Sequence, residues 1–329
     1  MKTMTSTERA ASHAREWSVA SAIAALTLVL AVAAPGFFSR ENLSDLLLAN
    51  LPVLLVAVGM TLVIISGEID ISVGSMFAVC AVASGILSKT GMPIWIAGAA
   101  ACLLGTAFGA LNGALVAYVG IPSIVVTLAT MTALRDGLRW ATEGAWVQDL
   151  PRSFQWLGLS HGQYPLAATA AAGLITAGLA FGLRHLAAGR AVYATGSNPF
   201  AARLAGLDTS ATKTCVFAIL GTLTGLAAVL NAARFNQIPS NAGIGLEMKV
   251  IASVVVGGAS VAGGAGSVLG TVLGLVLLAV TGPALTFLGV SAYWERAIQG
   301  TIILVAIAAD GIRRPAFRRL AGVETGARA

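Results

Sequence analysis

The 329-residue chain is 57% hydrophobic and only 10% charged, and its mean hydropathy is +0.85. Soluble domains carry about 25% charged residues, so this composition excludes an ordinary soluble protein and predicts an all-α polytopic membrane protein with one membrane domain. The net charge of +6 does not indicate a nucleic-acid partner, because the basic residues lie near the ends of apolar segments and form no stripe with aromatic residues.

The N-terminal region begins with a polar stretch of mixed charge, residues 1–16, which predicts a cytoplasmic tail. The first apolar run starts at Trp17 and ends near Pro35. A signal peptide is the alternative, since Ala31-Val32-Ala33 is similar to a small-residue cleavage site. The apolar run is longer than the roughly 7–15 residues of a signal peptide, which favours a retained first helix.

Further apolar runs follow, separated by polar turns and loops, and together they predict about ten transmembrane helices. The runs cover residues 45–66, 71–88, 94–118, 123–138, 165–184, 213–233, 266–288 and 293–310, with a less regular run that begins near Val250. Glycines at four-residue spacing predict faces where helix backbones approach closely. These glycines are Gly105, Gly109 and Gly113, then Gly221 and Gly225, and then Gly266, Gly270 and Gly274.

Ten crossings would place both chain ends on one face of the membrane. More than half of the 20 Lys and Arg residues lie on that face, including those of the loop at about 185–212 and of the basic tail at 312–329. The positive-inside rule therefore predicts that the N- and C-termini are cytoplasmic and that the transmembrane domain covers residues 17–311.

The stretch from Gly59 to Ser75 interrupts apolar sequence with two carboxylates, Glu68 and Asp70. Charged groups at membrane depth are costly unless they face water, a partner or a cavity, so they mark functional positions. Glu68, Asp70, Ser72 and Gly74 are predicted to form a helix break and a gate. A short hydrated turn between two helices is the alternative. The number of crossings places this break toward the cytoplasmic side.

The stretch from Arg190 to Ser210 carries a signal for a short cytoplasmic helix. Asn198 is a favoured N-cap and Pro199 a favoured first helical residue, and Gly206 is a typical helix end. Such a helix, which carries Phe200, Arg203 and Leu204, suits docking into a groove on another protein. The alternative is an amphipathic turn that rests on membrane lipid.

Several motifs of enzymes are missing from the sequence. There is no G-x-x-x-x-G-K-[ST] phosphate loop, and none of the four lysines follows a glycine. There is also no H-E-x-x-H motif, no G-x-S-x-G elbow and no Cys or His at metal-ligand spacing. These absences predict a non-enzymatic chain that binds neither metal nor cofactor.

Three segments carry a family resemblance, in this order along the chain: GMTLVIISGEIDISVGS at 59–75, YATGSNPFAARLAGLDTS at 193–210 and VIASVVVGGASVAGGAGSVLGTVLG at 250–274, followed by LGVSAYW at 288–294. On these residues the chain resembles the permease subunits of bacterial ATP-binding-cassette importers for sugars, the group typified by the ribose permease. The likeness extends over nearly the whole chain. It departs from the common pattern at Glu68, where many relatives have an uncharged residue.

The resemblance implies a multi-pass protein of the bacterial inner membrane that works with other subunits. These are a second permease copy or a homologue of it, a cytoplasmic ATP-binding subunit that uses ATP and Mg, and a periplasmic sugar-binding protein. It also implies that the loop at 185–212 contains the helix that couples to the ATPase. The residues assigned to this coupling are Asn198, Phe200, Ala202, Arg203, Leu204 and Gly206.

A neutral sugar would be stabilised in transit by hydroxyl and amide groups. The polar residues in apolar runs that are assigned to such a path are Asn50, Ser66, Ser75, Asn112 and Asn231, together with Ser72 of the break. Hydrogen bonds between helices are the alternative role for each of them. The predicted solute is a small neutral sugar: a pentose, a deoxyhexose such as rhamnose, or a related carbohydrate.

An ion-coupled secondary transporter of a small polar solute is the alternative function. In that case Glu68 and Asp70 would act as a proton relay, since broken helices are typical of such carriers. The capped cytoplasmic helix argues against it, because a carrier that works alone has no need of a docking helix.

Overall fold

The computed structural model describes residues 6–291, 294, 297–298, 300–301 and 304, with side chains from Trp17 onward. This part of the chain is almost entirely helical and contains no strand beyond one isolated antiparallel bridge between Val147 and Ile238. The α-helices are α1 Ser6–Ala33, α2 Arg40–Ile65, α3 Val73–Lys89, α4 Ile94–Ala114, α5 Ser123–Thr142, α6 Gln163–His185, α7 Ala187–Ser197, α8 Pro199–Leu204, α9 Thr209–Ala232, α10 Leu246–Val256 and α11 Val268–Phe287. Short turns of other helix types are η1 Pro35–Phe38, η2 Leu115–Val119 and η3 Gln155–Gly158.

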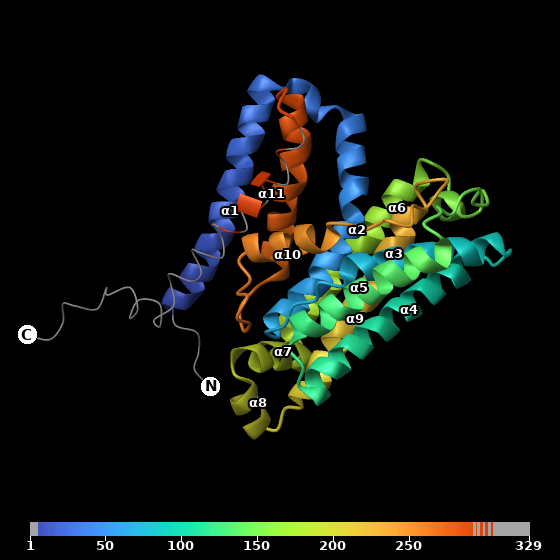
Figure 1. Ribbon diagram of the computed structural model, residues 1–329. Helices are drawn as coiled ribbons and strands as arrows, with labels where there is room; N and C mark the ends of the chain where they lie inside the picture. Colours follow the sequence, from blue (N-terminus) through green and yellow to red (C-terminus); the bar gives the residue numbers. More distant parts are fainter. Residues whose placement is uncertain (1–5, 292–293, 295–296, 299, 302–303, 305–329) are drawn as a thin grey trace, which may run out of the picture.

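The helices form two groups that share α2 (Figure 1). In the first group, α1 and the first half of α2 flank α11. The second half of α2 enters the second group, which contains α3, α4, α5, α6 and α9. Pro52 lies inside α2, and a proline removes one helical hydrogen bond and bends the helix. The short helix α10 crosses between the groups and contacts α2, α3 and α11.

Glycines hold the second group together, as their spacing predicts. Gly105 and Gly109 of α4 face Gly221 of α9 so closely that an added methyl group at Gly105 or Gly221 would overlap the backbone of the other helix. The hydroxyls of Thr106 and Thr222 lie 2.7 Å apart across the same contact. The predicted close packing of these two helices is therefore confirmed.

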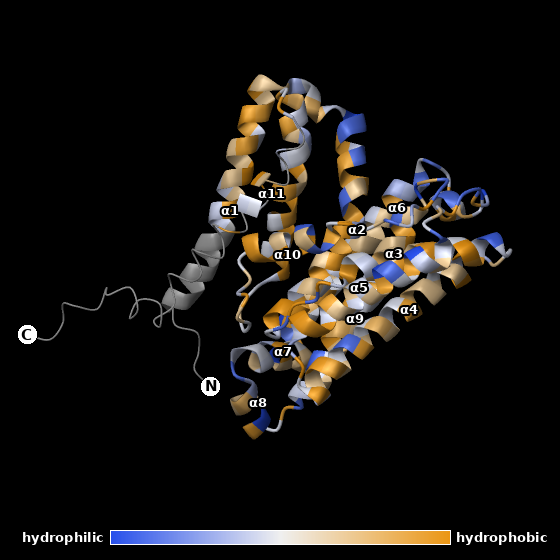
Figure 2. Cartoon of the chain, viewed as in Figure 1, coloured by the Kyte–Doolittle hydropathy of each residue, from blue (hydrophilic) through white to orange (hydrophobic). Residues whose placement is uncertain are grey.

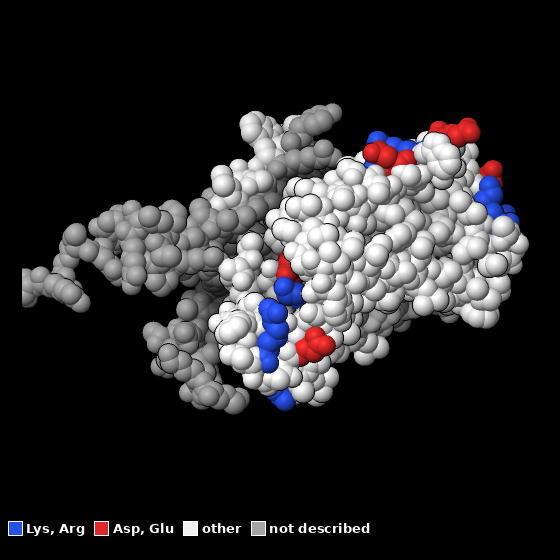
Figure 3. All heavy atoms as spheres, turned by 60° about the horizontal axis from the view of Figure 1, so that its bottom comes forward, with Lys and Arg blue, Asp and Glu red and all other residues white. Residues whose placement is uncertain are grey.

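Five of the described helices are long and apolar enough to cross a membrane. They begin at Arg40, Ile94, Gln163, Thr209 and Val268. Apolar residues cover the helix surfaces in Figure 2, and on the face shown in Figure 3 the charges gather at the two ends of the molecule with an uncharged band between them. The predicted all-α membrane fold is confirmed.

The count of ten crossings stays a prediction. The helix α10 has 11 residues, so it extends only about 16 Å, and the irregular segment 257–267 follows it. Most of the predicted run at 293–310 and the whole basic tail at 312–329 lie outside the described residues. The predicted N-terminal tail is helical from Ser6 onward, where it is continuous with the first apolar run.

Candidate functional site at the helix break

The helix α8 begins as the sequence predicts. The side chain of Asn198 accepts a hydrogen bond from the backbone N–H of Ala201 at 3.0 Å, and Pro199 is the first helical residue. Gly206 follows the helix with a φ of +83°, a left-handed conformation that glycine adopts without strain. The predicted capped helix is confirmed.

The surface of α8 is apolar and open. Phe200 is 68% exposed and Leu204 is 76% exposed, whereas Ala202 is buried. The exposed Arg203 donates from Nε to the carbonyl oxygen of Pro199 at 3.3 Å. Since only Ala202 faces the protein, α8 presents most of its surface at the lower end of the molecule in Figure 1.

The helix α7, which leads into α8, fits tightly against two other segments. Gly196 contacts both, and an added methyl group there would overlap the carbonyl oxygen of Ile65 and the backbone nitrogen of Gly264. Gly264 donates to that same Ile65 carbonyl at 2.8 Å. Tyr193 donates from its hydroxyl to the carbonyl oxygen of Gly266 at 2.8 Å, and burial raises the pKa of this phenol.

This glycine junction, formed by Ile65, Gly67, Gly196, Gly263 and Gly264, unites the three segments that carry the family resemblance. The end of α2 comes from the first segment, α7 from the second, and the loop before α11 from the third. Because backbone meets backbone here, none of these segments can shift without displacing the others.

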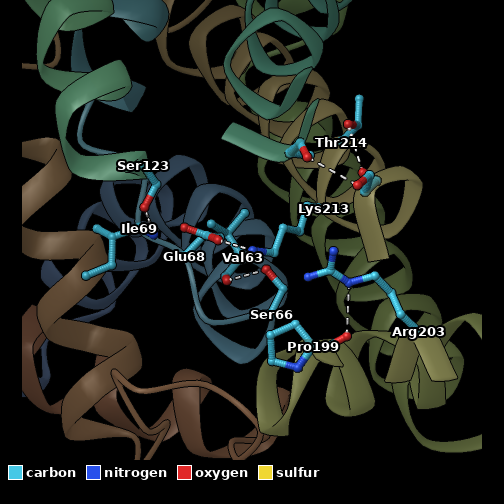
Figure 4. A network of polar contacts seen from close by, with 11 residues as sticks. Val63, Ser66, Glu68, Ile69, Ser123, Pro199, Arg203, Lys213 and Thr214 are labelled. Atoms are coloured by element: carbon cyan, nitrogen blue, oxygen red, sulfur yellow. Dashed lines mark hydrogen bonds and ion pairs between the residues drawn. The ribbon is translucent and has the colours of Figure 1, made fainter. Parts of the chain in front are cut away.

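Glu68 follows the junction and pairs with a basic residue of α9. Its carboxylate forms an ion pair with the ammonium group of Lys213, and the two side chains are 13% and 21% exposed. Figure 4 shows these side chains pointing toward each other. In this view Lys213 lies between Glu68 and Arg203 of α8. The next residue, Ile69, donates its N–H to the hydroxyl of Ser123 at 3.3 Å. The break thus contacts α5 and α9 near the α8 end of the molecule.

Asp70 is fully buried and lies in a closed polar network. Its Oδ1 accepts from the N–H of Ser72 at 2.7 Å and from the hydroxyl of Ser72 at 2.6 Å. Asn112 of α4 donates to Oδ2 of Asp70 at 3.5 Å and to the hydroxyl of Ser72 at 3.0 Å, while its own Oδ1 accepts from Thr130 at 2.7 Å.

The other residues assigned to a solute path lie apart from one another. Asn50 accepts from the ammonium group of Lys249 at 3.0 Å. Ser66 is buried and donates to the carbonyl oxygen of Val63 at 2.7 Å, and Asn231 is half-buried at the end of α9. Contact of these residues with a solute stays a prediction.

Ser75 and Gly74, at the start of α3, lie beside a pair of charges. The hydroxyl of Ser75 accepts from Nε of Arg135 in α5 at 3.2 Å. An added methyl group at Gly74 would overlap Oε2 of Glu247, a residue of α10. Neither Arg135 nor Glu247 was expected at a site from the sequence, because both lie close to other charged residues near the ends of apolar runs.

Metal ligands do not gather in the described part of the chain. No group of three or more His, Cys, Asp or Glu residues there could hold a metal ion. The polar groups near the break are therefore arranged for hydrogen bonds and ion pairs.

The fold and this site define a class. The chain has apolar helices that cross a membrane, a polar break inside them, and an exposed capped helix tied to that break. These features are those of a permease, a transport subunit of a membrane import system.

Comparisons with known proteins identify the family. The family described as "Branched-chain amino acid transport system / permease component" matches residues 42–307, and the chain belongs to it. The autoinducer 2 import system permease protein LsrC of Escherichia coli (strain K12 / DH10B) is 37% identical over 305 residues, which cover 90% of this chain and 88% of the relative.

Two further relatives have the same description. The LsrC protein of Enterobacter sp. (strain 638) is 35% identical over 307 residues, which cover 93% of this chain and 89% of the relative, and that of Photorhabdus luminescens is 33% identical over 312 residues, which cover 93% and 92%. No solved structure matches the chain. The predicted kinship with permeases of ATP-binding-cassette importers is confirmed, as is the location in the bacterial inner membrane.

Proposed function

We propose that this chain forms the translocation path of an ATP-driven importer for a small neutral polar solute. The observation that carries the proposal is the connection between α8 and the helix break. Asn198, which caps the exposed helix α8, directly follows α7. Gly196 in α7 contacts both the end of α2 and the loop before α11. A push on α8 therefore reaches three segments of the membrane domain through rigid backbone contacts.

The partners follow from the family and from the surface of α8. A cytoplasmic ATP-binding subunit would hold Phe200 and Leu204 in a groove and would hydrolyse ATP with Mg. A second copy of this chain, or a homologue, would complete the path, and a periplasmic binding protein would deliver the solute. Both termini would be cytoplasmic, with ten crossings between them. The chain itself would bind neither cofactor nor nucleic acid.

In this proposal the break acts as a gate near the cytoplasmic end. The ion pair between Glu68 and Lys213 joins the break to α9, close to the junction that α8 would move. Differential binding of the ATPase to two states of the permease would shift their populations, and this shift would drive the change in access. Ser72 and Gly74 would keep the start of α3 in place while Glu68 moves.

The candidate solutes come from the resemblance and from the relatives. The resemblance to the ribose permease favours a pentose, a deoxyhexose such as rhamnose, or a related carbohydrate. The relatives named above are described as importing autoinducer 2, and the family description refers to branched-chain amino acids. We therefore give autoinducer 2 and the two sugars priority and use leucine as the contrasting solute.

The experiment reconstitutes the chain into proteoliposomes with the ATPase and the binding protein of the same organism that assemble with it. We expect uptake of ribose, rhamnose or autoinducer 2 that depends on ATP and on the binding protein, and no uptake of leucine. Uptake by the purified chain alone, driven by a proton or sodium gradient, would instead establish the ion-coupled carrier and overturn the proposal.

A further inference from the structure

A second polar site lies on the other side of the α3 N-terminus from Asp70. Three segments contribute to it: Ser75 of α3, Arg135 of α5 and Glu247 of α10. At 1.5 Å per residue, Arg135 lies about 18 Å from the first residue of α5 and about 10 Å from its last. Arg135 thus lies in the body of α5, where its side chain contacts α3 and the loop before α10.

Only some of the hydrogen-bonding atoms of Arg135 and Glu247 have partners among the described residues. Arg135 donates from Nε to Ser75 at 3.2 Å and from Nη1 to the carbonyl oxygen of Ala242 at 3.1 Å. Its Nη2 lies beside Gly74 and has no acceptor among the described residues. The carboxylate of Glu247 is close enough to attract this guanidinium electrostatically. The two side chains nevertheless form no ion pair within 4.0 Å in the described part of the chain.

Glu247 also leaves one oxygen free. Its Oε1 accepts from the N–H of Gly245 at 3.2 Å. Its Oε2 is buried beside Gly74 and finds no hydrogen-bond donor in the described residues. A buried carboxyl oxygen without a donor is costly, so its retention inside a membrane domain points to a ligand.

The surroundings of the site are more polar than the lipid-facing helices. On α5, Thr132 lies about one turn before Arg135 and Asp136 directly follows it, and both are exposed. The exposed residues at the middle of α4 and α6 are apolar instead, such as Leu103 at 70% and Leu174 at 74%. The polar part of this exposed surface is confined to the stretch around Arg135, since Val125 and Leu128 nearer the start of α5 are exposed and apolar. A polar exposed stretch is suited to water and not to lipid.

We propose that Ser75, Arg135 and Glu247 form a contact site for the transported solute. The free donor at Nη2 and the free acceptor at Oε2 both lie against Gly74, so they match a hydroxyl pair that accepts one hydrogen bond and donates the other. A solute with a single net charge would be attracted by one group and repelled by the other. The site therefore disfavours such solutes and fits an uncharged solute with neighbouring hydroxyls, which can satisfy both groups. This inference rests on the proposed function and deepens it.

The test measures how much solute enters per ATP hydrolysed in proteoliposomes that contain the complete importer, with saturating loaded binding protein. Radiolabelled ribose, rhamnose and autoinducer 2 serve as probes. We expect Glu247→Gln, which keeps one acceptor for Gly245, to lower solute entry per ATP about tenfold while the ATPase rate stays at its wild-type level. Arg135→Gln should have a similar effect, and Ser75→Ala should lower the ratio about twofold.

The matched control is Arg139→Gln, one turn further along α5, where the side chain is exposed and pairs with the exposed Asp136. It should leave the ratio unchanged. If Glu247→Gln and Arg135→Gln also leave it unchanged, or if uptake and ATPase rate fall together in both, the site is structural and the inference is wrong. An absence of ATP-driven uptake by the wild-type importer would instead refute the proposed function.

A second measurement needs no solute. In a chain whose three cysteines are replaced by alanine, Thr132→Cys should react with a membrane-impermeant maleimide, because this face of α5 lines an aqueous path. Leu174→Cys on α6 is the control and should not react, since it faces lipid. Failure of Thr132→Cys to react in the folded importer would overturn the inference even if the first variants do not assemble.

Discussion

Two polar clusters flank the start of α3, and they differ in how completely their hydrogen bonds are satisfied. Around Asp70, both carboxyl oxygens have donors, and the amide of Asn112 uses its oxygen as well as its nitrogen. Around Arg135, one carboxyl oxygen of Glu247 has no donor in the described residues. The first cluster is closed, whereas the second lacks one hydrogen-bond partner.

The difference indicates different roles for buried polar groups in the same protein. A fully satisfied network fixes the backbone, because any movement would leave one of its groups unpaired. An incomplete network gains from a ligand that supplies the missing partner. The Asp70 cluster is therefore expected to hold the helix break in shape, and the Glu247 cluster to contact what passes through. The following changes test this distinction and the junction beside it.

The largest loss of stability is expected for Asp70→Ala. The change removes the acceptor of the Ser72 N–H and hydroxyl and leaves these donors buried without it, while the amide nitrogen of Asn112 keeps only its hydrogen bond to the Ser72 hydroxyl. We expect the free energy of unfolding to fall by about 3 kcal/mol, measured by thermal or chemical unfolding in detergent micelles. Asp136→Ala is the control, because its carboxyl is 72% exposed, and it should change the value by less than about 0.5 kcal/mol.

A wild-type unfolding curve for Asp70→Ala would show that the cluster does not hold the break. A comparison of Asp70→Ala with Glu247→Gln in the uptake experiment separates the two clusters further. Asp70→Ala should reduce the amount of folded importer, whereas Glu247→Gln should leave that amount unchanged and lower only the solute that enters per ATP.

A smaller but clear loss is expected for Gly196→Ala in the glycine junction. The added methyl group would overlap backbone atoms of Ile65 and Gly264, and backbone cannot retreat as a flexible side chain can. We expect a loss of about 2 kcal/mol in the same unfolding experiment. Gly178→Ala in α6 has open space around the new methyl group and should stabilise the helix slightly, by about 0.5 kcal/mol. Equal effects of the two changes would contradict the assigned packing.

Local features of this fold were predictable from the sequence, and long-range ones were not. The bounds of α8 follow from Asn198, Pro199 and Gly206, because caps and helix ends are determined by neighbouring residues. The glycine contact between α4 and α9 was predictable as a packing face, but not the identity of its partner, since the spacing describes only one helix at a time. The break at residues 66–72 was predictable because Glu68 and Asp70 interrupt an apolar sequence.

The partners of the break could not be predicted in the same way. Lys213 is 145 residues from Glu68, and Asn112 is 42 residues from Asp70, so no spacing in the sequence relates them. The family resemblance named three segments without showing that Gly67, Gly196 and Gly263 meet. Asn112 was assigned to the solute path from its residue type alone, and the structure places its amide inside the closed network.

A moderate effect is expected at the ion pair of Glu68 and Lys213. The pair is mostly buried, so its coupling energy should exceed that of an exposed pair and reach about 1 kcal/mol. A double-mutant cycle with Glu68→Gln and Lys213→Gln measures it by unfolding. The reversed pair, Glu68→Lys with Lys213→Glu, should recover part of the loss. Strict additivity of the two single changes would show that the contact contributes nothing to holding the break on α9.

The smallest effect on stability, and a large one on assembly, is expected for Phe200→Ala. The ring is 68% exposed, so its removal should change the free energy of unfolding by less than about 0.5 kcal/mol. If the ring is an anchor in a groove of the ATPase, its loss should weaken binding of that subunit at least about tenfold, measured by titration of the ATPase onto the solubilised permease. Leu174→Ala, which removes an equally exposed side chain from the lipid face of α6, should leave that affinity unchanged. Equal affinity for both variants would mean that α8 is not the docking helix. The proposed role of the outer surface in binding a partner would then be refuted, whereas the role of the Glu247 cluster in contacting a solute would be untouched.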